Sequence, residues 1–204
     1  MRTLATLFLA VLLLAAGRVH AQQFEGSIKI DLSWKPSRTT VLYYKAGRSL
    51  TQILEPSYAY NLRILKDPAN ASVVVYSLHN DEPHMEKMAL AQAGRVSEVL
   101  TAADASMEVE MVEETRVIEG HTCHKFVGTR MGRPITAWVA LDLAYIPVRE
   151  ITPPQSPEFI SYLQLPGVKG LVLEMETTDE AGRTIRIVNH VELTAVPDRM
   201  FVLP

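Results

Sequence analysis

Apolar and polar residues alternate with a period of two along much of this chain, and this pattern constrains the fold more than any other feature. Residues 28–34, 107–111, 135–141 and 171–175 each place apolar side chains at every second position, and 185–193 does so at Ile185, Ile187, Val191 and Leu193. Residues i and i+2 of a β-strand point to the same face of a sheet. The alternation therefore predicts strands with one face on a core and the other face near water.

Short turn sequences separate the alternating runs. They are Ala46-Gly47, Asp67-Pro68-Ala69-Asn70, Met131-Gly132 and Asp179-Glu180-Ala181-Gly182. Glycine, proline, asparagine and aspartate favour the backbone angles that tight turns need. Because the gaps are too short for the crossover that a parallel pair requires, we expect antiparallel hairpins.

Two segments depart from this period. Residues 96–105 are alanine-rich with apolar residues at helical spacing, which favours a short helix or helical turn. Ser156-Pro157-Glu158 combines a capping residue, a proline at the first helical position and an acid in the first turn. We expect a helix from there through Leu163 that stops at Pro166-Gly167, with Thr152-Pro153-Pro154 as a rigid approach.

These elements predict a mainly β (α+β) fold. We expect a single large curved antiparallel sheet of roughly nine or ten strands, because sheets of this width tend to curl. The predicted architecture is an unclosed half-barrel with one or two short helices on the concave face. The concave side of such a sheet is a common place for an apolar ligand.

The N-terminus has the pattern of an export signal. Arg2 precedes a largely apolar stretch at 4–16, and Val19-His20-Ala21 offers small residues for signal peptidase. The stretch is shorter than the ~20 residues that span a bilayer as a helix, and it suits a signal-peptide core. We therefore predict a signal peptide at 1–21 and a single lipoprotein-carrier-like β domain at 22–204. The alternative is an N-terminal membrane anchor.

Composition limits the class of partner. The chain carries a net charge of −3 and no basic cluster, so nucleic acid and anionic membrane surfaces are poor partners. No second apolar run has membrane length, so we expect no transmembrane segment in the mature chain. The single cysteine lies far from the cleavage site and cannot form an internal disulfide. These features predict a soluble periplasmic or extracellular protein without a lipid anchor.

The stretch IEGHTCHKF, residues 118–126, surrounds that cysteine with histidines. In a strand, His121 and Cys123 share one face and His124 lies on the other. Two ligands on one face do not complete a zinc site, which needs three or four. We therefore interpret Cys123 as a small apolar strand residue, and a metal-binding or nucleophilic role remains the alternative.

A second cluster contains His79 and His84 on either side of Asn80-Asp81-Glu82-Pro83. The intervening residues are typical of a hairpin turn, and the spacing matches no established metal motif. The candidate metal ligands in the chain are thus His79, His84, His121 and Cys123. We predict no resident cofactor and no cofactor-binding residue.

Acidic residues are concentrated at Glu108, Glu110, Glu113 and Glu114, which we interpret as the solvated face of a strand. The chain has no nucleophile-elbow serine motif, no phosphate-binding glycine loop and no dinucleotide fingerprint. We therefore expect no enzymatic activity and assign no catalytic residue.

The order of motifs resembles an exported bacterial family that is catalogued as a domain of unknown function. The resemblance includes a hairpin turn at Lys45-Ala46-Gly47-Arg48, the stretch Gly170-Leu171-Val172-Leu173 and the ending Met200-Phe201-Val202-Leu203-Pro204. Its most recognisable motif is matched by Ile118, Gly120, Cys123, Lys125, Phe126 and the later Trp138, whereas His121 stands where the family usually has a tyrosine.

That family is similar in turn to the periplasmic lipoprotein carriers and their outer-membrane receptor. Those proteins are unclosed antiparallel barrels whose concave, helix-covered face takes up acyl chains. The resemblance implies a half-barrel and an apolar ligand for this chain, but it transfers no ligand-binding residue, because the carriers' ligand-facing positions are defined by apolarity alone.

Three functional hypotheses follow. The first is a non-enzymatic periplasmic binding or carrier module for an apolar ligand, either an acyl chain or a lipoprotein. The eight methionines agree with an adaptable binding surface, although they can equally fill a core. The second is an envelope protein-interaction or sensing module without a small ligand. The third is a metal- or thiol-dependent enzyme centred on His79, His84, His121, Cys123 and His124.

Overall fold

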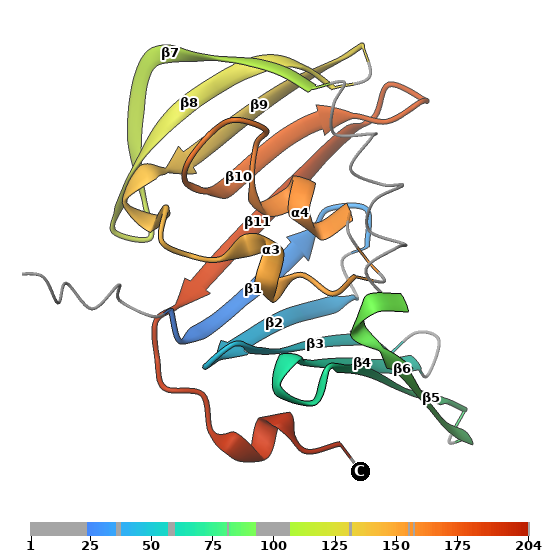
Figure 1. Cartoon of the computed structure of the whole chain (residues 1–204). Helices are drawn as coiled ribbons and strands as arrows, with labels where there is room; N and C mark the ends of the chain where they lie inside the picture. Colours follow the sequence, from blue (N-terminus) through green and yellow to red (C-terminus); the bar gives the residue numbers. More distant parts are fainter. Residues whose placement is uncertain are drawn as a thin grey trace, which may run out of the picture.

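One antiparallel sheet of eleven strands makes up most of the protein (Figure 1). The computed structural model describes residues 24–35, 38–56, 60–80, 82–92, 107–130, 132–154, 156 and 158–203. The predicted signal peptide and the predicted helix at 96–105 lie outside the described residues. The strands are β1 (Gly26–Leu32), β2 (Thr39–Lys45), β3 (Arg48–Glu55), β4 (Tyr60–Asp67), β5 (Ser72–His79), β6 (Glu82–Ala89), β7 (Met107–Ile118), β8 (His121–Arg130), β9 (Arg133–Ala140), β10 (Leu171–Thr178) and β11 (Thr184–Glu192).

The strand order is β6-β5-β4-β3-β2-β1-β11-β10-β9-β8-β7. Two meanders therefore meet where the first strand pairs with the last, at the register Ile28↔Val191 and Ile30↔Asn189. The sheet is not closed, because β6 and β7 stand at opposite ends of this order. The predicted fold class is confirmed, and the sheet is slightly wider than the expected nine or ten strands.

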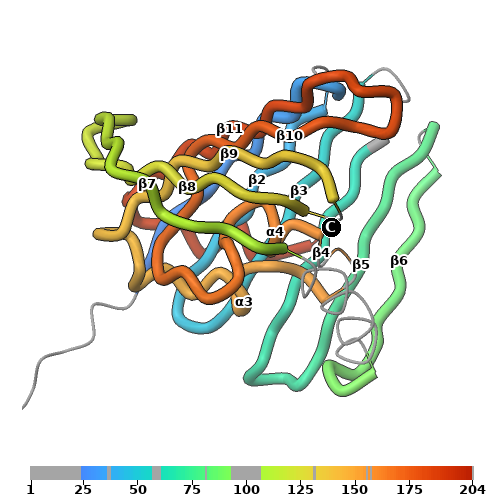
Figure 2. The backbone as a smooth tube through the Cα atoms, turned by 90° about the horizontal axis from the view of Figure 1, so that it is seen from above, coloured from blue at the N-terminus to red at the C-terminus, as the bar shows by residue number. Residues whose placement is uncertain are grey.

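The sheet curls around the helices α3 (Val148–Ile151) and α4 (Glu158–Leu163), which lie in its hollow (Figures 1 and 2). Viewed along the hollow, β7 and β8 form one margin and β5 and β6 form the other (Figure 2). The helix that begins near Ser156 is confirmed. The four-residue helix α3 was not expected, because so short a segment shows no helical period.

The predicted turns are confirmed where the structure describes them. Ala46 and Gly47 have φ of 49° and 82°, the left-handed pair of a two-residue hairpin turn between β2 and β3. Asp67 caps a short 3-10 helix, η2 (Pro68–Asn70), through its carboxylate. Trp34 lies beyond the end of β1, outside the alternating run in which we expected it, and packs edge-on against Tyr162.

Most of the alternating residues sort to the two faces as predicted, but Met111 and Leu193, which were expected on the core face, are 58% and 51% exposed. The even-numbered residues of β1, Ile28 and Ile30, are fully buried in the main core with α3 and α4, whereas Lys29 is exposed. The core therefore lies between the concave face and the helices. Its largest buried members also include Leu42, Leu143, Ile151, Phe159, Leu163, Leu165, Leu171, Leu173 and Met175.

The C-terminal segment covers part of the convex face. In η4 (Asp198–Phe201), Phe201 joins a small buried cluster with Leu50 and Val196. The guanidinium of Arg48 lies 4.7 Å from the centre of the Phe201 ring. This tail closes the outer surface of β2–β4 and leaves the concave side of those strands to other groups.

A buried amide fixes α4 over the sheet. The side chain of Asn189, on β11, is fully buried and donates to the carbonyls of Tyr162 (2.7 Å) and Val172 (2.9 Å). Val172 borders a register shift between β9 and β10. One amide group thus links α4, β10 and β11 at the centre of the fold.

We predict that Asn189→Ala lowers the free energy of unfolding by about 1–3 kcal/mol, because two buried carbonyls lose their donor. Thr184→Ala, at the exposed start of the same strand, is the matched control and should change stability by less than about 0.5 kcal/mol. Urea denaturation followed by circular dichroism measures both. Equal stability of the two variants would contradict the role given to Asn189.

Candidate ligand site on the concave face

The centre of the concave face is filled. Helix α3 packs against β2 and β3, and α4 packs against β10. The apolar side chains of both helices are buried in the same cluster as those of the sheet. No ligand can occupy this central region without displacing α3 or α4, so a binding site on the concave face would lie toward one margin of the sheet.

The margin formed by β4, β5 and β6 carries a second apolar surface on the concave side. Leu62 and Ile64 of β4 share this face with Val73 and Val75 of β5, as their pairing register shows. Met88 of β6 pairs opposite Val73 and completes the row. We call this row, together with Leu90, the β4–β6 floor; its partly buried members are Leu62, Val75, Met88 and Leu90.

A cavity of about 300 Å³ lies where the floor meets the helices. This volume is at the lower end of the roughly 300–1,000 Å³ typical of small-molecule pockets. Leu90 contributes from the floor, and Ile160 contributes from α4. The described lining residues are Lys66, Leu90, Arg149, Thr152, Pro153, Pro154 and Ile160.

Two cationic side chains, Lys66 and Arg149, line the cavity together with these apolar groups. Lys66 lies on the concave face of β4, opposite Val73, and its Nζ donates to the backbone carbonyl of Glu150 at 2.8 Å. Burial lowers the pKa of Lys66, and the carboxylate of Glu150 opposes that shift. Arg149 is exposed and has no ion pair with any residue that the structure describes.

The carboxylate of Glu150 is turned toward β2. Its Oε2 accepts a hydrogen bond from the hydroxyl of Tyr44 at 2.7 Å. Burial and this hydrogen bond raise the pKa of Tyr44 to about 12. The charged side chains among the described lining residues are both cationic. The Glu150 carboxylate lies close enough to act on the charge of Lys66, but its hydrogen bond is with Tyr44.

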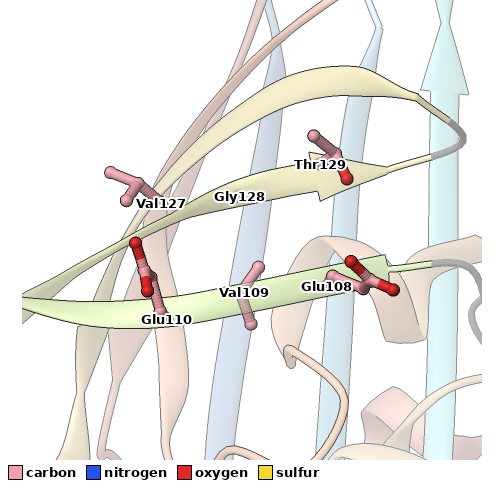
Figure 3. A pocket seen from close by; sticks show the side chains of 6 residues that line it. All are labelled: Glu108, Val109, Glu110, Val127, Gly128 and Thr129. Carbon is pink, nitrogen blue, oxygen red and sulfur yellow. The ribbon is translucent and has the colours of Figure 1, made fainter.

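Another hollow, of about 370 Å³, lies over the start of β7 and the end of β8 (Figure 3). Gly128 allows β7 to approach β8 closely here, since a Cβ there would lie 1.9 Å from the carbonyl oxygen of Glu108. Glu108 and Glu110 border it together with Thr129. Two carboxylates fall short of the six to eight oxygens that calcium takes, and the charged rim does not suit an apolar ligand.

A cleft of about 380 Å³ lies beside β1 and β11 and carries four cations, Lys29, Lys35, Arg38 and Arg186. Lys29 pairs with Asp31 at 3.0 Å, and Arg186 pairs with Glu174 at 2.9 Å. Because its lining is mostly charged or polar, this cleft is a weaker candidate for an apolar ligand than the cavity beside the β4–β6 floor.

The structure separates the candidate ligands of the IEGHTCHKF stretch. His121 Nδ1 lies 2.7 Å from a carboxylate oxygen of Asp142, whereas Cys123 is fully buried and its thiol donates to the His121 carbonyl at 3.6 Å. Burial, with the nearby charge of Asp142, raises the pKa of the Cys123 thiol to about 11. The thiol is therefore protonated near neutral pH, which disfavours both nucleophilic attack and metal binding.

His79 and His84 lie on adjacent strands near the hairpin between β5 and β6 and are both exposed. Within the part of the chain that the structure describes, no three or more histidine, cysteine or acidic side chains are grouped closely enough to hold a metal ion. Glu108, Glu110, Glu113 and Glu114 are exposed along β7, as expected for a solvated strand.

The residues that match the motif of the resembled family lie in a turn or on the strands β7, β8 and β9. Gly120, with φ of 85°, follows Glu119 in a two-residue turn between β7 and β8, and Ile118 ends the strand before it. Phe126 and Cys123 are buried on β8. Across the strand pair, Lys125 lies opposite Trp138, whose ring is covered by the guanidinium of Arg116 at 4.2 Å.

Sequence reasoning missed Lys66, Arg149 and Leu90. Lys66 could have been found from the sequence, because it alternates with Leu62 and Ile64 and so lies on an otherwise apolar face of its strand. Arg149 and Leu90 have no comparable signal, since only the folded chain brings them to the same cavity.

We predict that Cys123 does not react with a thiol reagent in the folded protein. A thiol pKa of about 11 instead of 9.0 lowers the thiolate fraction at pH 8 about 100-fold, and burial blocks access as well. Ellman's reagent should label the thiol only after denaturation, with Cys123→Ala as the blank. Rapid labelling of native protein would contradict this assignment.

Comparison with known proteins does not assign a family. No family model matches the chain, and no curated protein matches it. Two solved structures of PNGF-II, in space groups P21 and C2, are 14% and 15% identical, with TM-scores of 0.40 and 0.41. They cover 88% and 87% of this chain, which spans only 30% and 29% of theirs. None of the described helices is long and apolar enough to cross a membrane.

Proposed function

We propose that this protein is a non-enzymatic periplasmic binding or carrier module for an apolar ligand, such as an acyl chain or the acyl group of a lipoprotein. The observation that carries the proposal is the cavity between the β4–β6 floor and α4. Its walls are mostly apolar, and few polar groups converge on it, as is typical of small-molecule sites.

The floor supports an elongated ligand rather than a compact one. Leu62, Val75 and Met88 remain partly exposed along three adjacent strands, and they continue the apolar wall beyond the cavity itself. Strands lie about 4.8 Å apart, so a chain laid across β4, β5 and β6 would contact all three. Methionine at one end of this row adapts its shape to variable chains.

The filled centre of the sheet favours the second hypothesis, an interaction or sensing module without a small ligand. In that case α3 and α4 would be a fixed part of the core and the floor would be covered by a partner protein. The two functions differ in whether the isolated protein binds a small apolar molecule.

The test is a titration of purified protein with N-phenyl-1-naphthylamine, an uncharged probe that fluoresces in apolar surroundings. We predict saturable binding to the wild type. Leu90→Asp should weaken it by about tenfold or more, because the substitution places a carboxylate in the apolar wall. Met85→Asp is the matched control, since Met85 is 62% exposed on the other face of β6 and should bind as the wild type does.

Absence of saturable binding to the wild type, or equal loss in both variants, would contradict the proposed function. A protein that binds no probe but retains a stoichiometric partner on purification would instead support the interaction module.

A further inference from the structure

The two cations of the cavity suggest which end of a ligand it receives. Lys66 comes from the sheet and Arg149 from α3, and both line the same space as Leu90 and Ile160. Cations are usually excluded from apolar walls unless they have a partner, because desolvation of a charge is costly. Among the described residues, neither side chain has a carboxylate within salt-bridge distance.

The ammonium of Lys66 can donate three hydrogen bonds, and among the described residues its acceptor is the carbonyl of Glu150. Burial lowers the pKa of Lys66, because the charged form is disfavoured away from water, and the Glu150 charge opposes this shift. An anion placed beside Lys66 would relieve this penalty and would add charge-assisted hydrogen bonds.

Arg149 supplies a different kind of donor. The planar guanidinium presents paired N–H groups that match the two oxygens of a carboxylate. Arg149 is exposed on α3 and Lys66 is half-buried on β4, and both residues line the cavity. The Glu150 carboxylate accepts a hydrogen bond from Tyr44 and forms no salt bridge with Lys66, although its charge offsets part of the pKa shift of that lysine.

We propose that the ligand is a single-chain amphiphile with a carboxylate head group, which Lys66 and Arg149 bind while the chain lies on the β4–β6 floor. This inference rests on the proposed function and narrows it to one chemical class. The charge arrangement distinguishes a fatty acid from an alcohol or ester of the same chain, since only the acid provides an anion to the two cations.

The experiment compares three ligands that share one chain: dodecanoic acid, dodecanol and methyl dodecanoate. Each displaces N-phenyl-1-naphthylamine from full-length mature protein at pH 7.5 and low salt. We expect the acid to bind about tenfold or more tightly than the other two, as charge-assisted hydrogen bonds predict. Its advantage should fall as salt is raised, because Arg149 is exposed.

Two variants test whether Lys66 and Arg149 cause the preference for the acid. Arg149→Gln keeps the length and polarity of an exposed side chain, and Lys66→Met keeps the stem and removes the charge. Each should reduce the advantage of the acid severalfold and leave dodecanol binding unchanged. Lys87→Gln, on the other face of exposed β6, is the control and should preserve the full advantage.

The outcomes separate this inference from the proposed function. If all three ligands displace the probe equally, or if the preference survives in both variants, the head-group assignment is wrong and the apolar site stands. If the probe itself does not bind the wild type, the proposed function fails as well. Should Lys66→Met fold poorly, Arg149→Gln alone decides, because its side chain contributes nothing to the core.

Discussion

The pairing of the first strand with the last holds this protein together. β1 and β11 are separated by most of the chain, yet six consecutive residue pairs, from Ser27↔Glu192 to Leu32↔Ile187, join them in register. Every other strand pair in the sheet is a hairpin or a connection within one meander. Without this one non-local pairing, the chain would form two smaller sheets, each with an additional open edge and an incomplete core.

The same junction places the helices. Asn189 lies opposite Ile30 in the β1–β11 pair, and its amide holds α4 above β10 and β11. Since α3 and α4 occupy the centre of the hollow, the concave surface of β4–β6 lies to one side of them. The cavity beside Lys66 therefore lies at the boundary between these helices and the uncovered part of the sheet. No additional loop or domain is needed to form it.

Much of the fold could be predicted from the sequence because its information is local. Strict alternation identified β1, β7, β9, β10 and β11, and Ala46-Gly47 identified a hairpin whose two residues have positive φ. The edge strand β6 was harder to predict from the sequence, because its residues are almost all exposed and Pro83 interrupts the alternation. A proline is tolerated there because an edge strand leaves part of its backbone unpaired. The four residues of α3 are too few to show a period.

The candidate site could not be predicted in the same way. A lysine on an apolar strand face, such as Lys66, is visible in the sequence, but its meaning depends on the arginine that α3 brings to the same cavity. Conversely, the fold does not bring the candidate ligands at 121–124 together, because Cys123 is fully buried and His121 lies beside Asp142. Alternation alone separated Cys123 from His124, whereas the full burial of Cys123 required the packed structure.

The central claim is that a fatty acyl chain lies on the concave floor of β4–β6. Nuclear magnetic resonance of methyl-labelled protein with a stearate that carries a nitroxide near its chain end tests this directly. A chain in this position should broaden the methyl signals of Leu62, Val75, Met88 and Leu90 much more than those of Leu50 and Val196, which are buried in the cluster on the convex face. Broadening confined to the convex face, or uniform across the protein, would contradict it.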